Sequence, residues 1–338
     1  MGPVSMKTTA VYFVLLLSGC NAMQRDLVLP AGRAEAVVAA DLDGDGRDEL
    51  ISYTEGRLEW MGQSTPIEGR MVAADVGMRG STEVALLAFG PSKANPRAPA
   101  RAWLVSNDGI EAVDTATTRI SDVQVLPQGL LITRALSDKR TETIQIGPAG
   151  STVLSTTIMG LKARRIGRDQ SIVVGRLYGD EPRSHGSLEI HRSDGSISRI
   201  PTIRGVRSLA VGDVDGDGQE DVVFSDGWHF KYGSQAQALM GYLSGPELSE
   251  VVRLDELKAN FAVDHIDIVR PGVIVASGTS DVAVLRRGDT GWSTTVVGPR
   301  PSLGLPTVAS VEGGWFSSAP THWIVSPGDP VTAQDIAL

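Results

Sequence analysis

The sequence predicts an all-β fold built from a repeated unit, and three observations support this prediction. The 338-residue chain is rich in turn-forming residues, with 38 Gly and 18 Pro. Few long stretches have the amphipathic period of a helix, which argues against a helical body. One acidic segment occurs twice, at 41–49 and 213–221, each time between a small apolar run and a strand-like aliphatic run.

The N-terminal segment is predicted to direct export. Lys7 precedes an apolar run over 11–17, which is too short to cross a bilayer about 30 Å thick as a helix. Residues 17–20, Leu-Ser-Gly-Cys, resemble the lipobox at which bacterial lipoproteins are cleaved and lipidated. We therefore expect a lipoprotein signal peptide over 1–19, lipidation of Cys20, a short tether over 20–25 and a single folded domain over 26–338.

Cys20 is the only cysteine in the chain, which excludes an internal disulfide, a cysteine-based zinc site and a redox pair. Several acyl chains on one cysteine anchor a protein stably to a membrane. We expect a bacterial cell-envelope location, and Asn21 favours the outer membrane because it is not the Asp of an inner-membrane retention signal. The expected partners are the membrane and an envelope protein or glycan. The net charge of −9 argues against nucleic acid.

The two acidic segments place oxygen donors at alternate positions. Positions 1, 3, 5 and 9 carry carboxylates, and Gly at position 6 allows a sharp turn that lets the carbonyl of position 7 point inward. Hard oxygen donors in this number suit Ca²⁺ better than Zn²⁺ or copper. The expected metal ligands are Asp41, Asp43, Asp45, Arg47 and Glu49 in the first loop and Asp213, Asp215, Asp217, Gln219 and Asp221 in the second.

These segments are not EF-hands. An EF-hand requires a bidentate Glu at position 12, where this chain has Ser52 and Phe224. The residues after each segment are strand-like and not helical. Two solvated acidic turns are the alternative, since Asp-Gly pairs form turns without a metal.

With Ala39-Ala40 before the first loop and Val211-Gly212 before the second, the segments resemble the FG-GAP or VCBS repeat family. That family includes the propeller of integrin α subunits and many bacterial surface proteins. The resemblance implies a β-propeller whose blades carry Ca²⁺ in the turn between their first two strands. It covers two blades strongly and the rest of the chain only by pattern.

The spacing of the repeats predicts seven blades of four strands each. The two loops begin 172 residues apart, and four propeller blades of roughly 43 residues fill that distance. Degenerate copies begin near residues 75, 122, 166, 267 and 310, each with an apolar strand, a polar turn and a second apolar strand. A β-sandwich with coincidental strand pairs, or a ring of six or eight blades, is the alternative.

The copy at 75–83 keeps acidic residues at positions 1 and 9 but has Arg79 at position 5. We expect this unit to fold without metal, with Arg79 paired to Asp75 or Glu83. One basic cluster is expected to be a solvated strand edge, where Lys and Arg prevent edge pairing. It consists of Lys162, Arg164, Arg165 and Arg168.

The sequence carries no motif of a serine hydrolase, a zinc protease or a phosphate-binding loop. The predicted Ca²⁺ is structural, because its ligands come from one short segment with no adjacent general base. The expected function is therefore a binding or scaffold module and not an enzyme. The alternatives are a carbohydrate-active enzyme resembling a polysaccharide lyase, and a structural envelope protein without a ligand. Acidic, basic and His side chains from different blades in one deep funnel would favour the enzyme.

Overall fold

The structure is a computed structural model. It describes residues 34–54, 56–91, 95–113, 115, 119–136, 140–158, 160–167, 170–178, 185–201, 205–226, 239–244, 248, 250–253, 263–278, 282–297, 308–311, 314–317, 323–326 and 332–335. The predicted signal peptide, Cys20 and the tether at 20–25 lie outside these residues. In the described ranges no helix is long and apolar enough to cross a membrane.

The described residues form seven four-stranded antiparallel sheets, and each sheet is made of four consecutive strands. The first strands are β1 (Ala36–Ala40), β5 (Arg70–Arg79), β9 (Ile120–Leu126), β13 (Gly160–Arg165), β17 (Val206–Gly212), β21 (Val263–Arg270) and β25 (Val308–Val311). The second strands are β2 (Glu49–Thr54), β6 (Thr82–Gly90), β10 (Gly129–Ala135), β14 (Ile172–Tyr178), β18 (Asp221–Asp226), β22 (Val273–Gly278) and β26 (Gly314–Ser317). The prediction of an all-β fold is confirmed.

The outer strands complete each sheet. The third strands are β3 (Arg57–Trp60), β7 (Arg101–Ser106), β11 (Arg140–Gly147), β15 (His185–His191), β19 (Leu239–Ser244), β23 (Val282–Gly288) and β27 (Trp323–Ser326). The fourth strands are β4 (Gln63–Pro66), β8 (Gly109–Val113), β12 (Gly150–Ile158), β16 (Ile197–Pro201), β20 (Glu250–Arg253), β24 (Gly291–Val297) and β28 (Thr332–Asp335). Sheets 1 to 7 below follow this chain order.

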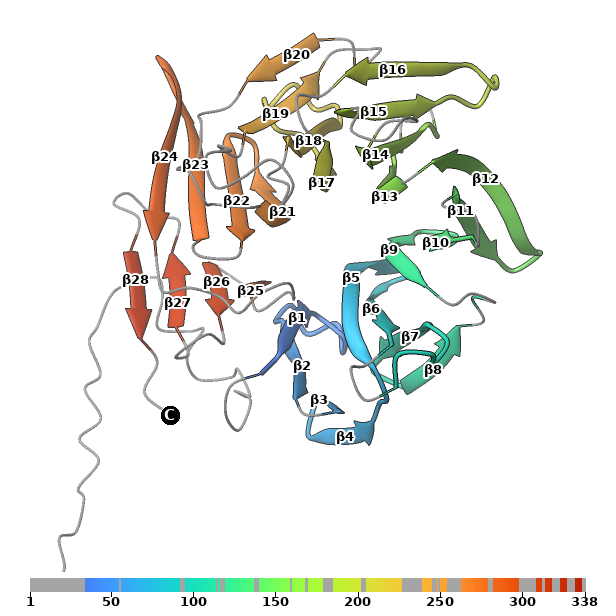
Figure 1. The fold of residues 1–338 in the computed structure, drawn as a ribbon. Helices are drawn as coiled ribbons and strands as arrows, with labels where there is room; N and C mark the ends of the chain where they lie inside the picture. The colour runs from blue at the N-terminus through green and yellow to red at the C-terminus, as the bar shows by residue number, and fades with distance from the viewer. Residues whose placement is uncertain are drawn as a thin grey trace, which may run out of the picture.

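The sheets follow one another around a common centre, with the first strand of each nearest to it (Figure 1). The first strands of neighbouring sheets contact one another from β1 through β5, β9, β13 and β17 to β21. β1 also contacts β25, so the first and the last sheets meet. This arrangement is consistent with the blades of a propeller.

The hydrophobic core is divided into layers between neighbouring sheets. β6 shows the cause, because successive side chains of a strand point to opposite faces. Ala85, Leu87 and Phe89 pack against sheet 1, while Val84, Leu86 and Ala88 pack against sheet 3. Similar clusters join sheets 3 and 4, sheets 4 and 5, and sheets 5 and 6. A strand buried on both faces therefore has a continuous apolar sequence.

Glycine lets two pairs of first strands approach closely. A Cβ atom on Gly77 of β5 would lie 3.0 Å from the Cβ of Val125 on β9. One on Gly212 of β17 would lie 3.2 Å from the Cδ1 of Ile268 on β21. These distances are shorter than ordinary van der Waals contact, so a larger residue would push the neighbouring sheets apart.

The interface between sheets 3 and 4 depends on a buried ion network. Glu189 on β15 is 2% exposed and Arg176 on β14 is 3% exposed. Their Oε1 and NH1 atoms are 2.8 Å apart, and the Thr157 hydroxyl of β12 donates to Glu189 Oε2 at 2.8 Å. The apolar cluster between these two sheets is small, with five buried members. Polar contacts thus replace part of the apolar core at this interface.

Glu189 remains ionised in acid because its partners outweigh its burial. Burial raises its pKa, but hydrogen bonds from His191 and Thr157 and the charges of Arg176 and Arg199 lower the pKa to about 2. A carboxylate with a lowered pKa stabilises the fold above its unfolded pKa near 4.5, and this contribution is lost as the pH falls towards about 2.

We predict that Glu189→Gln lowers the free energy of unfolding by about 3–5 kcal/mol at pH 7, because it removes a buried negative charge 2.8 Å from the Arg176 guanidinium. Urea unfolding measures the change. The matched control is Glu142→Gln, which removes a carboxylate 3.0 Å from Arg134 with side-chain exposures of 18% and 21% and should cost about 0–1 kcal/mol. Equal losses in both variants would contradict the assigned role of Glu189.

Candidate functional site

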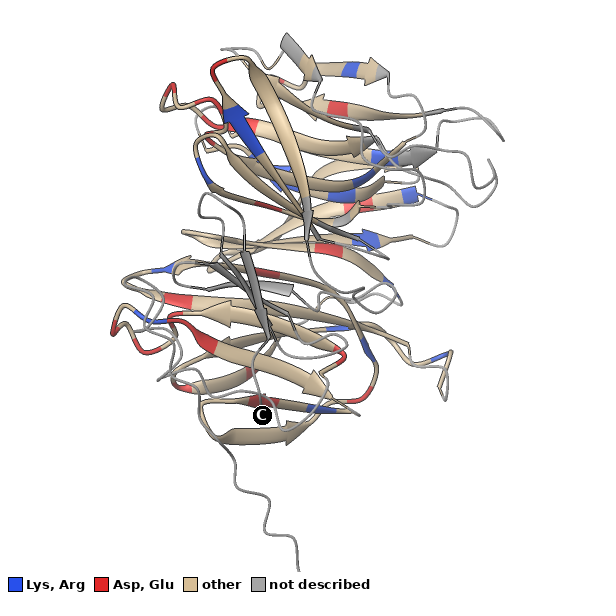
Figure 2. Cartoon of the chain, turned by 90° about the vertical axis from the view of Figure 1, so that its left-hand side faces the viewer, with Lys and Arg blue, Asp and Glu red and all other residues tan. Residues whose placement is uncertain are grey.

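The two acidic loops occupy equivalent positions in sheets 1 and 5. One joins β1 to β2 and the other joins β17 to β18, so each connects the first two strands of its sheet. In Figure 2, acidic segments project from loops along one side of the molecule, in its upper and its lower half. The sequence placed both loops correctly between two strands.

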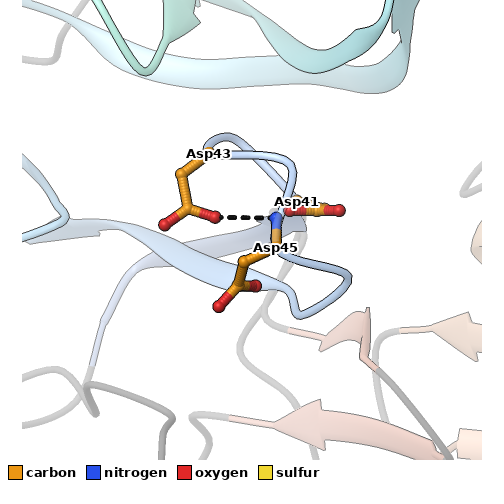
Figure 3. Close-up of side chains that lie close together, drawn as sticks. All are labelled: Asp41, Asp43 and Asp45. Carbon is orange, nitrogen blue, oxygen red and sulfur yellow. Dashed lines mark hydrogen bonds between the residues drawn. The ribbon is translucent and has the colours of Figure 1, made fainter.

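Backbone amides of the first loop fix its carboxylates. Asp41 accepts hydrogen bonds from Gly44 N at 2.8 Å and from Gly46 N at 3.0 Å. Asp43 accepts from Asp45 N at 3.0 Å (Figure 3), and Asp45 accepts from Arg47 N at 2.9 Å. Gly44 and Gly46 have positive φ angles of 78° and 86°, a conformation that favours glycine.

The second loop repeats these hydrogen bonds at the corresponding positions. Asp213 accepts from Gly216 N at 2.7 Å and from Gly218 N at 3.1 Å. Asp215 accepts from Asp217 N at 3.2 Å, and Asp217 accepts from Gln219 N at 2.7 Å. The two loops therefore share one conformation, which the repeated sequence implied.

The acidic residue at position 9 closes each loop at the start of the second strand. Glu49 Oε2 accepts from Leu42 N at 2.8 Å, and Asp221 Oδ2 accepts from Val214 N at 2.9 Å. Burial raises the pKa of Glu49 and of Asp221, and the neighbouring Asp side chains raise both pKa values further. Negative charge is thus concentrated in both loops.

Three carboxylates converge in each loop. Ligand atoms of Asp41, Asp43 and Asp45 lie within 4.8 Å of one another, as do those of Asp213, Asp215 and Asp221. Glu49 and Asp217 are not in these groups. Converging oxygen donors fit a hard cation such as Ca²⁺, whose ligands lie about 2.3–2.6 Å from the ion. The residues present therefore fit the expected metal in its chemical preference.

Each loop is tied to the following sheet. In the first loop, Asp41 N donates to Glu83 Oε2 of β6 at 2.9 Å. In the second loop, Arg287 of β23 donates to the Asp215 carbonyl at 2.7 Å, and Gly272 N donates to the Val214 carbonyl at 2.8 Å. A cation that holds either loop rigid would therefore also stabilise an interface between sheets.

A second group of charged side chains lies on the first strands, and we call Asp75, Asp122, Lys162 and Arg164 the inner-strand cluster. Asp122 of β9 is 1% exposed and accepts from Lys162 Nζ of β13 at 3.2 Å. It also accepts from the Ala163 amide at 3.0 Å and pairs with the Arg164 guanidinium. Both Asp122 oxygens thus bind groups of the next sheet.

Asp75 of β5 completes the inner-strand cluster. Its Oδ2 accepts from Val125 N of β9 at 2.8 Å, and its Oδ1 lies 4.0 Å from Arg164 NH2. Burial raises its pKa to about 6, although Arg164 and Lys162 oppose this shift. The side chain keeps 22% of its surface exposed, so solvent reaches part of it.

Charges of the inner-strand cluster also shift the pKa of His265 on β21. Burial lowers its pKa, Asp267 and Asp122 raise it, and the positive charges of Lys162 and Arg164 lower it. His265 is thus electrostatically coupled to residues of sheets 3 and 4 although it lies on sheet 6. Asp75, Asp122, Lys162, Arg164 and His265 thus all lie on first strands, which belong to four different sheets.

The structure corrects two sequence interpretations. Lys162 and Arg164 are not a solvated edge, because both pair with the buried Asp122; Arg168 lies outside the described residues. Asp75 does not begin a loop, since it lies inside β5 opposite Leu86. Asp75 instead accepts from Val125 N of β9 and lies near Arg164 of β13, and Glu83 accepts from the Asp41 amide. The expected pairing of Asp75 or Glu83 with Arg79 is therefore wrong.

One sequence feature could have revealed the inner-strand cluster. A single Asp lies among the apolar residues of each of two first strands, in Met71-Val-Ala-Ala-Asp75-Val and Ile120-Ser-Asp122-Val. A charge in a strand that is buried on both faces requires a partner. That partner is 42 residues away for Asp122 and Arg164, so the sequence pattern could not identify it.

A pocket of about 400 Å³ lies between sheets 2 and 3. Its walls include Arg79, Glu111, Leu104 and Ile146. No residue of the acidic loops or of the inner-strand cluster lines it. It is therefore a separate feature from both.

Comparisons with known proteins support the fold. No protein-family model matches the chain, and the comparison with curated proteins gave no match. A hydrazine synthase structure from Kuenenia stuttgartiensis has a TM-score of 0.58 at 10% identity, over 93% of this chain and 99% of that one. Virginiamycin B lyase from Staphylococcus aureus has a TM-score of 0.53 at 10% identity, over 80% and 85%. A streptogramin B lyase has a TM-score of 0.53 at 13% identity, over 80% and 84%.

Such low identities show the fold alone, and the neighbours are β-propeller-like proteins. They do not point to FG-GAP or VCBS repeats in particular. The expectation that this chain is not an enzyme is contradicted, because its structural neighbours include enzymes. A missing motif did not exclude catalysis, since a site that takes one side chain from each of several sheets leaves no local motif.

We predict that Asp75→Asn makes stability less dependent on pH. The folded-state pKa of Asp75 is raised from 3.8 to about 6, so its contribution to stability is full below 3.8 and is lost as the pH rises through 6. The unfolding free energy of the variant minus that of the wild type should therefore be larger at pH 8 than at pH 4. The increase should be on the order of 1–3 kcal/mol. Urea unfolding at both pH values measures it, with Asp108→Asn at an exposed turn as control. An unchanged difference would show that Asp75 does not titrate in this range.

Proposed function

We propose that this protein is a lipid-anchored β-propeller of the bacterial cell envelope, stabilised by Ca²⁺, that binds a partner or ligand at its centre. In this proposal the seven sheets are the blades of a closed ring of the FG-GAP or VCBS type. The contact between β1 and β25 supports closure of the ring. The Leu-Ser-Gly-Cys segment ending at Cys20 supports the lipid anchor.

The observation that carries the proposal is the shared conformation of the two acidic loops. Loops 172 residues apart in sequence make corresponding backbone hydrogen bonds to Asp41 and to Asp213. Each brings three carboxylates together, an arrangement that like-charge repulsion opposes and that a cation would stabilise. The role of the metal would be structural, because the loops are tied to neighbouring sheets.

The acidic loops also support the proposed location in the cell envelope. Loops that bind Ca²⁺ weakly are filled outside the cytoplasm, where modules with dissociation constants of about 10⁻⁴–10⁻³ M occur. A lipid on Cys20 would hold the protein at the membrane, with the outer membrane as the proposed site. The expected partner is an envelope protein or a glycan, and the net charge of −9 makes nucleic acid an unfavourable partner.

An enzyme of the carbohydrate-active, lyase-like class is the second candidate, and one observation favours it. The inner-strand cluster and His265 bring acidic, basic and imidazole groups from different sheets into electrostatic contact. Groups of these kinds, contributed by different sheets, are the usual components of acid and base catalysis. Turnover of a polysaccharide by the purified protein, lost in Asp75→Asn, would support this candidate.

We predict that Ca²⁺ stabilises the fold at both loops. With a dissociation constant of about 0.1 mM and about 1 mM free Ca²⁺, each site would add roughly 1.4 kcal/mol. The double variant Asp215→Ala with Asp217→Ala should keep about half of the stabilisation, which thermal unfolding with Ca²⁺ and with chelator measures. Asp108→Ala with Asp289→Ala, which removes two exposed turn carboxylates, is the matched control. A melting temperature that chelator does not change would sink the metal proposal.

We predict that Cys20→Ser releases the protein from membranes or blocks its processing, because the lipid has no other attachment site in a chain with one cysteine. Membrane fractionation and mass spectrometry of the N-terminus measure the two outcomes. Normal processing with continued membrane association would show that Cys20 is not the anchor.

A further inference from the structure

We infer that the inner-strand cluster of Asp75, Asp122, Lys162 and Arg164 is a binding site for a small ligand bearing one carboxylate, and that binding is coupled to proton uptake by Asp75. This inference rests on the proposed binding role of the centre of the ring and names the residues and the ligand class. Three observations carry it: the unequal use of the polar atoms in the cluster, their contact with solvent, and their charge balance.

Asp122 has all its hydrogen-bond partners, whereas Lys162 and Arg164 keep donor groups that it does not use. Asp122 is saturated by Lys162, Arg164 and the Ala163 amide. The Lys162 ammonium has three N–H groups, and the structure gives it one hydrogen bond within the described residues, to Asp122. Arg164 NH2 has Asp75 Oδ1 at 4.0 Å, beyond hydrogen-bonding distance. Asp122 thus holds two cations in place and leaves donor capacity on both.

Solvent reaches these side chains although they lie on first strands. The side chains of Lys162 and Arg164 are 17% and 13% exposed, and that of Asp75 is 22% exposed. Asp122 behind them is 1% exposed. Two cationic side chains that a buried carboxylate holds in place at a partly exposed site suit a carboxylate ligand, because charge-assisted hydrogen bonds are stronger away from bulk water.

The charges favour a monoanion. With Asp75 ionised, its charge and that of Asp122 cancel those of Lys162 and Arg164. With Asp75 protonated, one positive charge remains, which a single carboxylate neutralises. A carboxylate beside an ionised Asp75 would instead meet like-charge repulsion. Ligand binding and protonation of Asp75 therefore favour each other.

The groups around Asp75 on the neighbouring strands allow this coupling. β9 contributes Asp122, and β13 contributes Lys162 and Arg164. β1 has no titratable residue between Ala36 and Ala40, and Glu83 at the start of β6 binds the Asp41 amide. On β21, the charge of Asp267 raises the pKa of His265, and the charges of Lys162 and Arg164 lower it. The pKa of Asp75 itself lies near neutrality, at about 6.

Glucuronate and glucose form a matched pair of probes, because they share a ring and differ by one carboxylate. We expect purified full-length protein to bind glucuronate and not glucose in calorimetry at pH 5.5. If binding requires protonated Asp75, a pKa of about 6 predicts affinity about 25-fold weaker at pH 7.5. Binding of both sugars alike, no binding of glucuronate at pH 5.5, or affinity that rises with pH would overturn the inference.

Two variants separate the roles within the cluster. Asp75→Asn should reduce the pH dependence to less than about 3-fold and bind at pH 7.5 nearly as wild type does at pH 5.5. Lys162→Gln should weaken binding at pH 5.5 at least about tenfold, whereas Arg79→Gln, on the exposed end of β5, should not change it. If Lys162→Gln does not fold, the near-isosteric Asp75→Asn decides, because retained pH dependence would overturn the inference. Chelator-sensitive melting with no glucuronate binding would refute this site and leave the proposed Ca²⁺ role intact.

Discussion

The arrangement of the sheets depends on how the inner edges of their first strands are satisfied. Within the described ranges, a first strand pairs with the second strand of its own sheet on one side and has no ladder partner on the other. The backbone groups of that edge need other partners, because a buried unpaired amide is costly. Side chains of the preceding sheet supply them: Asp75 binds Val125 N, Asp122 binds Ala163 N, and Gln124 binds Arg165 N at 2.7 Å. Each contact joins one sheet to the next.

This constraint explains why charged side chains lie on the first strands, next to the apolar layers between the sheets. An Asp that caps a neighbouring strand brings its own charge into a poorly solvated place and then needs a cation. Lys162 and Arg164 supply that cation for Asp122. The interface between sheets 3 and 4 follows the same principle farther out, where Glu189 is balanced by Arg176. Stability is therefore distributed over many interfaces, and each needs a specific polar contact as well as an apolar layer.

The sequence predicted those features whose partners are close in the chain. The acidic loops could be recognised because carboxylates and the amides that fix them lie within nine residues, from Asp41 to Glu49. The all-β class and the paired first and second strands followed from turn residues and alternation. Asp75 was misplaced, because its match to the loop template ignored that β5 continues to Arg79 before turning. The partners of Asp75 and Asp122, about 40–50 residues away on other sheets, have no local sequence pattern.

The two charged sites differ in a way that bears on function. In the acidic loops, every predicted ligand comes from one segment, so a bound cation would have its coordination filled by the protein and little room for a substrate. In the inner-strand cluster, each sheet contributes one or two side chains, and the side chains of Lys162 and Arg164 are partly exposed. Substitutions on one strand at a time can change such a site without disturbing the other sheets. Chemistry or ligand selectivity is therefore more readily placed at the centre of this fold, whereas the acidic loops hold neighbouring sheets in position around it.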